Sequence, residues 1–156
     1  MQTFLPYQDF RQSAEVLDSR RLGKQRSESI IILKTLLGMY EGSGGWPHHP
    51  ATKMWRGHEA SLVEYSAEIC LEWQRRGNKD TCLDWLINIA SPRGWLGSEK
   101  HPVPQWLGWR RFHLGHQSNL LRKMPEHYRT FWPDVPDDLP YVWPKPREVV
   151  TIMEGS

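Results

Sequence analysis

The sequence predicts an all-α protein, a compact single-domain helical bundle with long Gly/Pro-rich loops and an extended Pro-rich C-terminal tail. Apolar residues recur at spacings of three and four in several segments, whereas no segment shows the strand-length alternation typical of a sheet. No internal repeat is present. A chain of 156 residues can bury the core of one domain without disulfides or metals. We expect residues 1–124 to form the helical body and residues 125–156 to wrap the surface.

The first two helices are predicted near the N-terminus. Asp9 and Gln12 have the spacing of a helix N-cap and its capping-box partner, so a short helix is expected over about residues 10–17. A second helix is expected over residues 20–37, and its first half is almost entirely polar. Residues 38–50 are rich in Gly and Pro and predict an exposed loop. That loop would present Trp46, His48 and His49.

The strongest helical pattern in the chain begins at Pro50, a residue suited to a first helical turn. Apolar and aromatic residues continue the pattern to Trp73, and the basic pair followed by Gly77 favours termination. Asp80 can cap a further short helix. Residues 91–105 predict a second Pro/Gly loop, and a last helix is expected over residues 110–123. The closely spaced prolines beyond it predict an extended tail.

Composition excludes several classes of protein. The two cysteines follow no zinc-ribbon spacing, and the N-terminus lacks a basic region followed by an apolar stretch, so we expect a reduced, cytoplasmic monomer. The longest apolar run is too short to span a bilayer, and no membrane partner is expected. Nine tryptophans, five tyrosines, four phenylalanines and seven histidines exceed what a core of this size requires. Some of these rings are expected to face a ligand.

The first candidate site is the polar half of the second helix. Arg21, Gln25 and Glu28 fall on one helical stripe, and Arg20 with Lys24 forms an adjacent one, with Asp18 at the start of both. One interpretation is a solvated charged face with Asp18 as a helix cap. The other is a phosphate-binding surface that holds one carboxylate among cations, where it stays ionised.

The second candidate site surrounds His58. This histidine lies on the apolar stripe of the helix expected from Pro50, so a core histidine is favoured over a ligand. Gly57 in a helix interior suggests a close approach to the backbone. A metal is not favoured, because the His58–Glu59 pair lacks the second histidine of HExxH.

The third candidate site combines aromatic and basic residues late in the chain. Rings interleaved with Arg suit unpaired bases, because a ring stacks on a base while Arg holds the phosphate. Stacked core tryptophans are an equally acceptable explanation. The net charge of +2 decides little, since clustering of cations matters more for nucleic-acid binding. The region contains Trp106, Trp109, Arg110, Arg111, Phe112, His113, His116, Asn119, Arg122, Lys123, Tyr141 and Trp143.

Five stretches together resemble the pyrimidine-dimer DNA glycosylase (endonuclease V-like) family, most closely its bacterial and actinobacterial branch. They are MQTFLPY (1–7), LDSRRLGKQRSE (17–28), HPATKMWRGHEASL (49–62), EWQRRG (72–77) and DLPYVWP (138–144). The resemblance extends over nearly the whole chain. It implies a compact helical enzyme that binds duplex DNA, flips a nucleotide out of the stack and cleaves a glycosidic bond.

The chain departs from the founding member of that family in two respects. The founder uses the α-amine freed by removal of the initiator Met, and Gln2 is too large for normal removal, so an associated lyase step is not assumed. The founder's carboxylate falls near Arg20 and Arg21, which Asp18 and Glu28 flank here. We take Asp18 as the catalytic carboxylate, with Glu28 as the alternative.

The sequence therefore predicts a DNA N-glycosylase without a cofactor, acting on double-stranded DNA. The expected substrate is either a hypermodified phage base such as glucosylated hydroxymethylcytosine, which implies antiphage defence, or a pyrimidine dimer, which implies repair. A non-catalytic DNA-binding module and a metal-dependent hydrolase using His48, His49, His58 and Glu59 are the alternatives. Site residues are expected as follows: catalytic, Asp18, Gln25 and Arg21; DNA-binding, Arg20, Lys24, Arg26, Arg56, Arg110, Arg111, Arg122 and Lys123; base pocket or wedge, Trp46, His48, His49, Trp55, His58, Tyr141 and Trp143.

Overall fold

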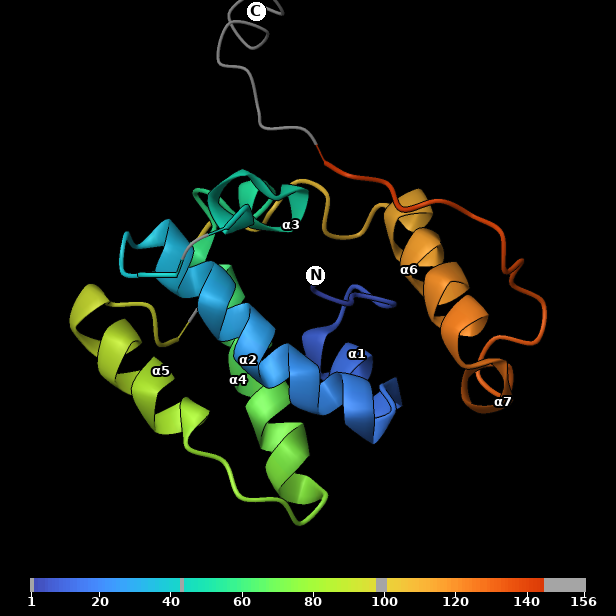
Figure 1. Cartoon of the computed structure of the whole chain (residues 1–156), viewed down its shortest axis with the longest axis horizontal. Helices are drawn as coiled ribbons and strands as arrows, with labels where there is room; N and C mark the ends of the chain where they lie inside the picture. Colours follow the sequence, from blue (N-terminus) through green and yellow to red (C-terminus); the bar gives the residue numbers. More distant parts are fainter. Residues whose placement is uncertain (1, 43, 98–100, 145–156) are drawn as a thin grey trace, which may run out of the picture.

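The computed structural model describes residues 2–42, 44–97 and 101–144, and within these ranges the chain is all-helical and has no strand, as predicted (Figure 1). No helix in these ranges is both long and apolar enough to cross a membrane. The α-helices are α1 (Phe10–Val16), α2 (Ser19–Leu36), α3 (Pro50–Lys53), α4 (Glu59–Arg75), α5 (Cys82–Ala90), α6 (Arg110–Lys123) and α7 (Pro125–Tyr128). Two 3-10 turns, Trp46–His48 and Ser91–Arg93, complete the set.

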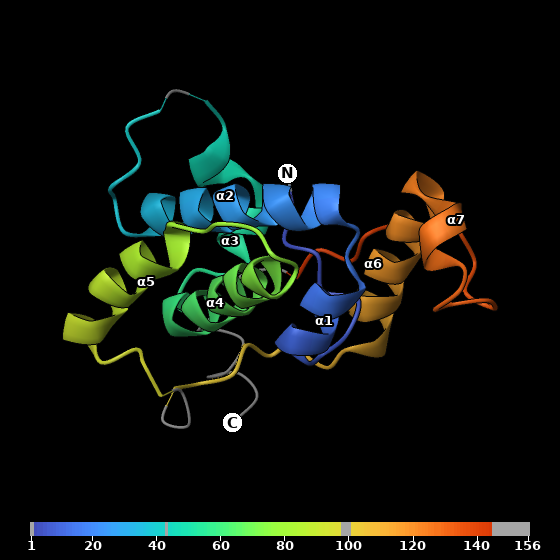
Figure 2. The same cartoon turned by 90° about the horizontal axis from the view of Figure 1, so that it is seen from below.

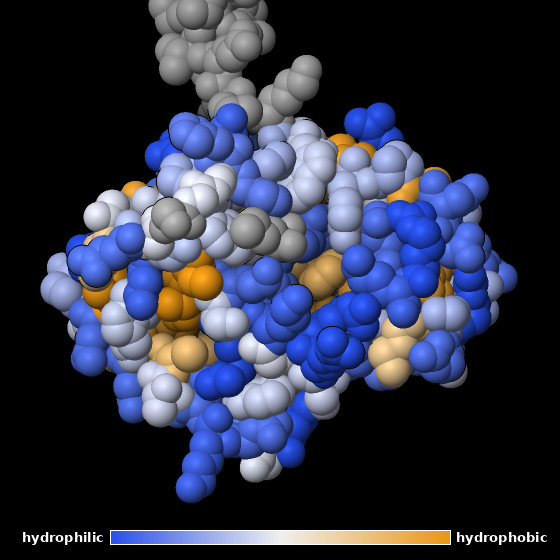
Figure 3. All heavy atoms as spheres, viewed as in Figure 1, coloured by the Kyte–Doolittle hydropathy of each residue, from blue (hydrophilic) through white to orange (hydrophobic). Residues whose placement is uncertain are grey.

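The body of the molecule is built around α2 and α4, which pack along one another, with α1 against α4 and α5 against both (Figures 1 and 2). The pair α6 and α7 lies on the other side of the molecule, and the N-terminal segment 2–7 lies between α2 and α6 (Figure 1). Figure 3 shows that hydrophilic residues dominate the middle of the face on which α2 lies. The pair α6 and α7 has few contacts with the other described helices. The N-terminal segment joins the two sides, because Phe4 N–H donates to Gln25 of α2 and Leu5 N–H donates to His116 of α6.

Several helix ends lie where the sequence predicts them. Asp9 caps α1 by accepting a hydrogen bond from the Gln12 backbone N–H at 2.9 Å. Asp80 Oδ2 accepts from the Leu83 backbone N–H at 2.9 Å at the start of α5. The helix predicted over residues 110–123 is α6, with the same bounds. Local capping hydrogen bonds thus mark the starts of α1 and α5, whereas α6 begins without a side-chain cap.

The long helix predicted from Pro50 is wrong, because the chain breaks between α3, which ends at Lys53, and α4, which begins at Glu59. Gly57 has φ +85°, a left-handed conformation that a helix interior does not contain. A methyl group at Gly57 would meet no other atom within 4 Å, so the glycine supplies backbone freedom and not the predicted close approach. His58 consequently occupies the N-cap position of α4 and not an interior position on its apolar stripe.

The C-terminal tail departs from the prediction at its start and agrees with it afterwards. Residues Pro125–Tyr128 form the single turn α7, because a proline at the first helical position needs no backbone N–H donor. Residues 129–144 contain no regular structure and run back along α6 (Figure 1). The predicted tail residues 145–156 lie outside the described residues.

Candidate functional site

A pocket of about 640 Å³ opens between the N-terminal half of α2, the N-terminal segment, the junction of α6 with α7, and the tail. Segments from both ends of the chain therefore share one site. Its lining is mostly polar and charged: Gln2, Phe4, Asp18, Arg20, Arg21, Lys24, Gln25, Glu28, Lys123, Met124, Glu126 and Tyr141.

Asp18 is the N-cap of α2 and also lies in the wall of this pocket, so its role as a helix cap does not exclude a functional one. Its Oδ2 accepts from the Arg21 backbone N–H at 3.3 Å, and its Oδ1 accepts from the Arg21 guanidinium at 3.2 Å. The Tyr128 hydroxyl also donates to Oδ1. Burial alone would raise the pKa of Asp18, but the hydrogen bonds from Tyr128 and Arg21 hold that pKa below its ordinary value. The carboxylate is therefore ionised at neutral pH.

Gln25 has a different task from the predicted catalytic one. Its side chain is fully buried, and its Oε1 accepts from the Phe4 backbone N–H at 3.1 Å and from the Tyr65 hydroxyl at 2.7 Å. Its Nε2 donates to the Gln2 carbonyl at 2.7 Å and to Glu28 at 3.3 Å. Because both ends of the amide are occupied within the protein, Gln25 fixes the N-terminal segment against α2 and does not face a substrate with a free donor or acceptor.

Three exposed cations surround the pocket, and all three are among the predicted DNA-binding residues. Arg20 and Lys24 come from successive turns of α2, and Lys123 comes from the last turn of α6. Arg21 lies deeper and pairs with Asp18. The fold thus brings cations about a hundred residues apart in sequence to one pocket, where they suit the phosphates of a nucleic acid.

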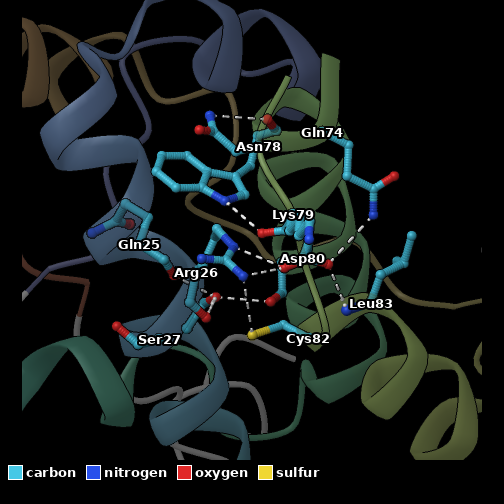
Figure 4. A network of polar contacts seen from close by, with 12 residues as sticks. Gln25, Arg26, Ser27, Gln74, Asn78, Lys79, Asp80, Cys82 and Leu83 are labelled. Carbon is cyan, nitrogen blue, oxygen red and sulfur yellow. Dashed lines mark hydrogen bonds and ion pairs between the residues drawn. The ribbon is translucent and has the colours of Figure 1, made fainter. Parts of the chain in front are cut away.

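Arg26, also predicted to bind DNA, is instead part of the contact between α2 and α5 (Figure 4). Its Nε donates to Asp80 Oδ1 at 2.8 Å, and its guanidinium lies 5.0 Å from the centroid of the Trp73 ring. The Asp80 side chain is completely buried. An arginine held between a buried carboxylate and an aromatic ring is not available for phosphate, so the prediction for Arg26 is wrong.

Arg122 is likewise committed within the protein. Its guanidinium donates to the carbonyl oxygens of Asp137 and Leu139 and to Asn119. Asn119 in turn donates to the Leu139 carbonyl at 3.2 Å. Arg122 therefore holds the tail against α6, which replaces its predicted contact with DNA.

The other predicted DNA-binding residues lie outside the pocket lining. Arg110 and Arg111 are exposed at the N-terminal end of α6, the end opposite Lys123. Arg56 is exposed in the break between α3 and α4. These three cations remain predictions for contacts with more distant phosphates.

The surplus of aromatic rings is mostly core, which corrects the predicted roles of Trp46 and Trp55. Trp55 is 0% exposed, donates its Nε1–H to Thr3 Oγ1 at 3.0 Å, and packs edge-on against Trp106 at 4.9 Å. Trp46 is 7% exposed and packs against His49. Rings buried to this extent cannot stack on a base in this conformation.

Of the two tail rings predicted for the base pocket, Tyr141 lines the pocket and Trp143 does not. Tyr141 is half-buried and lines the pocket, and Trp143 packs behind it with ring centroids 5.6 Å apart. The segment Asp138–Pro144, called the strap below, thus brings one aromatic ring, that of Tyr141, to the pocket. Of the rings singled out in the sequence, Tyr141 is best placed to contact a nucleotide.

The histidines predicted for the base pocket lie elsewhere. His48 is exposed, and His49 Nδ1 accepts from the Ala51 backbone N–H at 3.0 Å, which caps α3. Burial lowers the pKa of His58, whose Nδ1 has no hydrogen-bond partner among the described residues. Within the part of the chain that the structure describes, no three His, Cys, Asp or Glu side chains are grouped to hold a metal ion. The metal-dependent hydrolase thus gains no support.

Sequence reasoning missed several residues of the site, above all Tyr128, which contacts Asp18 without lining the pocket itself. Its hydroxyl contacts Asp18, 110 positions away in sequence. Gln2, Phe4, Met124 and Glu126 were also not singled out. These residues carry no spacing signal, because tertiary packing brings them to α2: Gln2 and Phe4 through hydrogen bonds with Gln25, and Met124, Glu126 and Tyr128 through the return of the chain after α6.

A comparison with protein-family models matches residues 1–86 to the model described as pyrimidine dimer DNA glycosylase. The match includes Asp18 and the α2 cations and ends before Lys123, Tyr128 and Tyr141. No significant match was found among curated proteins or among solved structures.

Proposed function

The chain belongs to the pyrimidine dimer DNA glycosylase family, and we propose that it flips a damaged or modified pyrimidine out of duplex DNA and cleaves its glycosidic bond to leave an abasic site. The observation that carries this proposal is the position of Asp18, a carboxylate ionised at neutral pH in the wall of a pocket rimmed by Arg20, Lys24 and Lys123. A pocket of this charge pattern suits a sugar flanked by phosphates.

In the proposed mechanism, Arg20, Lys24 and Lys123 bind backbone phosphates and stabilise the extruded nucleotide. Extrusion costs a few kcal/mol of unstacking, which is lowest at a damaged or distorted base. Tyr141 belongs to the strap and lines the pocket. In this mechanism its ring contacts the flipped nucleotide. These contacts place the C1′ atom of the sugar near the pocket wall, where the glycosidic bond breaks.

Breaking the bond builds positive charge on the sugar, and a fixed carboxylate stabilises that charge, as in glycoside hydrolysis. Both Asp18 oxygens already accept hydrogen bonds, so Asp18 acts as an oriented negative charge more readily than as a proton acceptor. Glu28, the other α2 carboxylate in the pocket, is the alternative candidate and suits the activation of a water. Arg21 helps to keep Asp18 ionised, first through its hydrogen bonds and then through its charge.

Two substrates fit the proposal. The family name favours a pyrimidine dimer. The pocket volume of about 640 Å³ and the carboxylates of Asp18, Glu28 and Glu126 also suit a sugar-bearing base, because hydroxyl groups donate to carboxylates. A glucosylated hydroxymethylcytosine in phage DNA is the second candidate, and it would make the protein an antiphage enzyme.

The experiment that separates the substrates counts abasic sites after incubation with ultraviolet-irradiated DNA and with phage DNA carrying glucosylated cytosine. Abasic sites in one DNA identify the substrate. Strand breaks seen without alkali treatment would reveal an associated lyase step. Salt-dependent binding with no abasic product in either DNA would contradict the proposal and favour the non-catalytic DNA-binding module.

Asp18→Asn tests the catalytic residue. Asn still caps a helix, so we expect the fold and DNA affinity to persist while base release is lost. Asp9→Asn is the matched control, because Asp9 caps α1 in the same way and does not line the pocket. Full activity of Asp18→Asn would remove Asp18 from the mechanism, and Glu28→Gln would then test the alternative.

A further inference from the structure

Tyr128 ends α7 and reaches across to the first turn of α2. Its hydroxyl donates to Asp18 Oδ1 and accepts from the Asp18 backbone N–H at 3.0 Å. One hydroxyl thus holds both the carboxylate and the backbone of the same residue. Arg21, the other partner of Asp18, belongs to α2 itself. Tyr128 therefore supplies the contact that fixes Asp18 relative to the α6–α7 side of the pocket.

The tyrosine ring is itself fixed. It is fully buried, stacks on Trp132 with centroids 5.5 Å apart and planes 3° apart, and meets His127 edge-on at 4.6 Å. Tyr128 does not belong to the pocket lining. Because the ring lies behind Asp18 and not beside a substrate, any effect on the reaction must act through the carboxylate.

The Tyr128 hydroxyl is a permanent donor. Burial raises the pKa of Tyr128, and its hydrogen bond to the Asp18 carboxylate raises this pKa further. The hydroxyl therefore stays protonated at neutral and mildly alkaline pH. Other charged groups share the pocket with Asp18: Arg20, Arg21, Lys24 and Glu28 from α2, Lys123 from α6 and Glu126 from α7. The exposed members of this set are screened by solvent, whereas the Tyr128 contact is buried.

We propose that Tyr128 is a positioning residue for the reaction, whose hydroxyl aims the Asp18 carboxylate into the pocket and couples it to the C-terminal side of the fold. This inference rests on the proposed function of Asp18. It assigns a role in catalysis to the segment after residue 86, which the family match does not include.

Tyr128→Phe tests the inference, since it keeps the stacked ring and removes only the hydroxyl. We expect kcat for base release to fall about 10- to 100-fold, the size of loss seen when the hydrogen-bond partner that orients a metal-binding side chain is removed. KM and DNA affinity should be unchanged, and the acid limb of the kcat profile should move to higher pH. Titration of the Asp18 carboxyl carbon by NMR should show the same upward movement.

Tyr7→Phe is the matched control. The Tyr7 hydroxyl accepts from Trp132 Nε1 at 3.0 Å, in the same aromatic cluster, and does not contact Asp18. This variant should leave kcat, the acid limb and the Asp18 titration at their wild-type values. Equal effects of the two substitutions would mean that general loosening of the cluster explains both, which would overturn the proposal.

A folded Tyr128→Phe variant with wild-type kcat and wild-type Asp18 titration would also overturn it. Site-specific 3-fluorotyrosine at position 128 provides a second test that keeps the hydroxyl and makes it a stronger donor. The Asp18 titration should then move to lower pH, and an unchanged titration would contradict the inference. The NMR measurement needs no activity, so it tests the Tyr128–Asp18 contact by itself. Failure of the proposed function would be seen separately, as an active Asp18→Asn variant.

Discussion

Two arginines of α2 each pair with an aspartate, and the two pairs have the same chemistry and different surroundings. Asp18 pairs with Arg21, Asp80 pairs with Arg26, and each aspartate accepts a backbone N–H at the start of a helix. Burial opposes ionisation of both, yet their hydrogen bonds lower both pKa values. The Asp80 side chain is enclosed between α2 and α5, with Cys82 beside its arginine (Figure 4). Asp18 instead opens on the pocket.

The comparison teaches that an ionised, arginine-paired carboxylate is not by itself a functional signal. Asp80 joins α2 to the start of α5. Asp18 lies where four separate segments meet: α2, the N-terminal segment, the α6–α7 junction and the strap Asp138–Pro144. We therefore expect perturbation of the α2–α5 joint to affect stability alone, and perturbation of the pocket side to affect stability and activity together.

The largest expected effect is acid sensitivity on the pocket side. His116 Nδ1 accepts from the Leu5 backbone N–H at 3.0 Å, and burial lowers the pKa of His116 from 6.5 to about 3. Between these values the unfolded chain binds a proton that the folded chain does not. The free energy of unfolding should therefore fall by roughly 1.4 kcal/mol per pH unit between pH 6.5 and pH 3, a total of about 5 kcal/mol over the whole interval.

Urea unfolding at pH 7 and pH 5 measures this slope. His116→Asn, which retains an acceptor near Leu5, should be less pH-dependent over that interval. The contact between Asp80 and Arg26 gives no pH dependence of stability between pH 7 and pH 5. Because the pKa of Asp80 is lowered, its contribution to the free energy of unfolding is lost only as pH falls below the ordinary aspartate value of 3.8. A wild-type stability that does not change between pH 7 and pH 5 would contradict the assignment of His116.

The next largest effect is expected at the joint. Asp80→Asn leaves Arg26 partly buried without its counter-charge and should lower the free energy of unfolding by about 3 kcal/mol. Base release per folded molecule should not change, since neither residue lines the pocket. Thermal unfolding and an abasic-site assay at a temperature where the variant is folded measure the two quantities. A loss of base release by the folded Asp80→Asn variant would contradict the expectation that the α2–α5 contact affects stability alone.

A smaller effect is expected where the strap meets α6. A methyl group at Gly115 would lie 2.7 Å from the Pro140 carbonyl oxygen, so Gly115→Ala should displace the strap and cost about 2 kcal/mol of stability. Tyr141 follows Pro140 and should move with it, which raises KM for the DNA substrate severalfold. Stability is measured by urea unfolding and KM by base release. A rise in stability with unchanged KM would show that the strap does not shape the pocket.

The smallest effect is expected at Gly57, which belongs to neither region. Gly57→Ala should cost about 1 kcal/mol, because a side chain disfavours the left-handed backbone at φ +85°. Gly45→Ala is the control, since Gly45 has φ −89° and a methyl group there would meet no atom within 4 Å. Thermal unfolding compares the two variants. Equal stabilities would mean that the break between α3 and α4 relaxes to accept alanine.

Most of the helical fold could be predicted, because it follows from local rules. Asp9, Asp18 and Asp80 each accept a hydrogen bond from the backbone N–H three residues later, and this local contact marks a helix start. The break before α4 could not be predicted from periodicity, since Gly57 fits both an interrupted and a continuous pattern. Its left-handed φ decides between them.

The candidate site could be predicted only in part. Asp18, Arg20, Arg21 and Lys24 lie within one helical segment, so their spacing alone brings them together. The tryptophans could not be assigned, because composition gives their number and does not tell which of them are buried in the core. Trp55 illustrates the difficulty, since its sequence neighbourhood resembles a ligand site and its ring is completely buried.

By itself, the sequence determined the helical class, the helix ends marked by capping residues and the cationic stripe around Asp18. These features depend on residues within a few positions of one another, and local hydrogen bonding and periodicity fix them. Only the tertiary structure decided that Tyr128 holds Asp18, that Lys123 and Tyr141 complete the pocket, and that Arg26 and Arg122 are structural. Those assignments depend on which distant segments pack together, and packing of the whole core sets that arrangement.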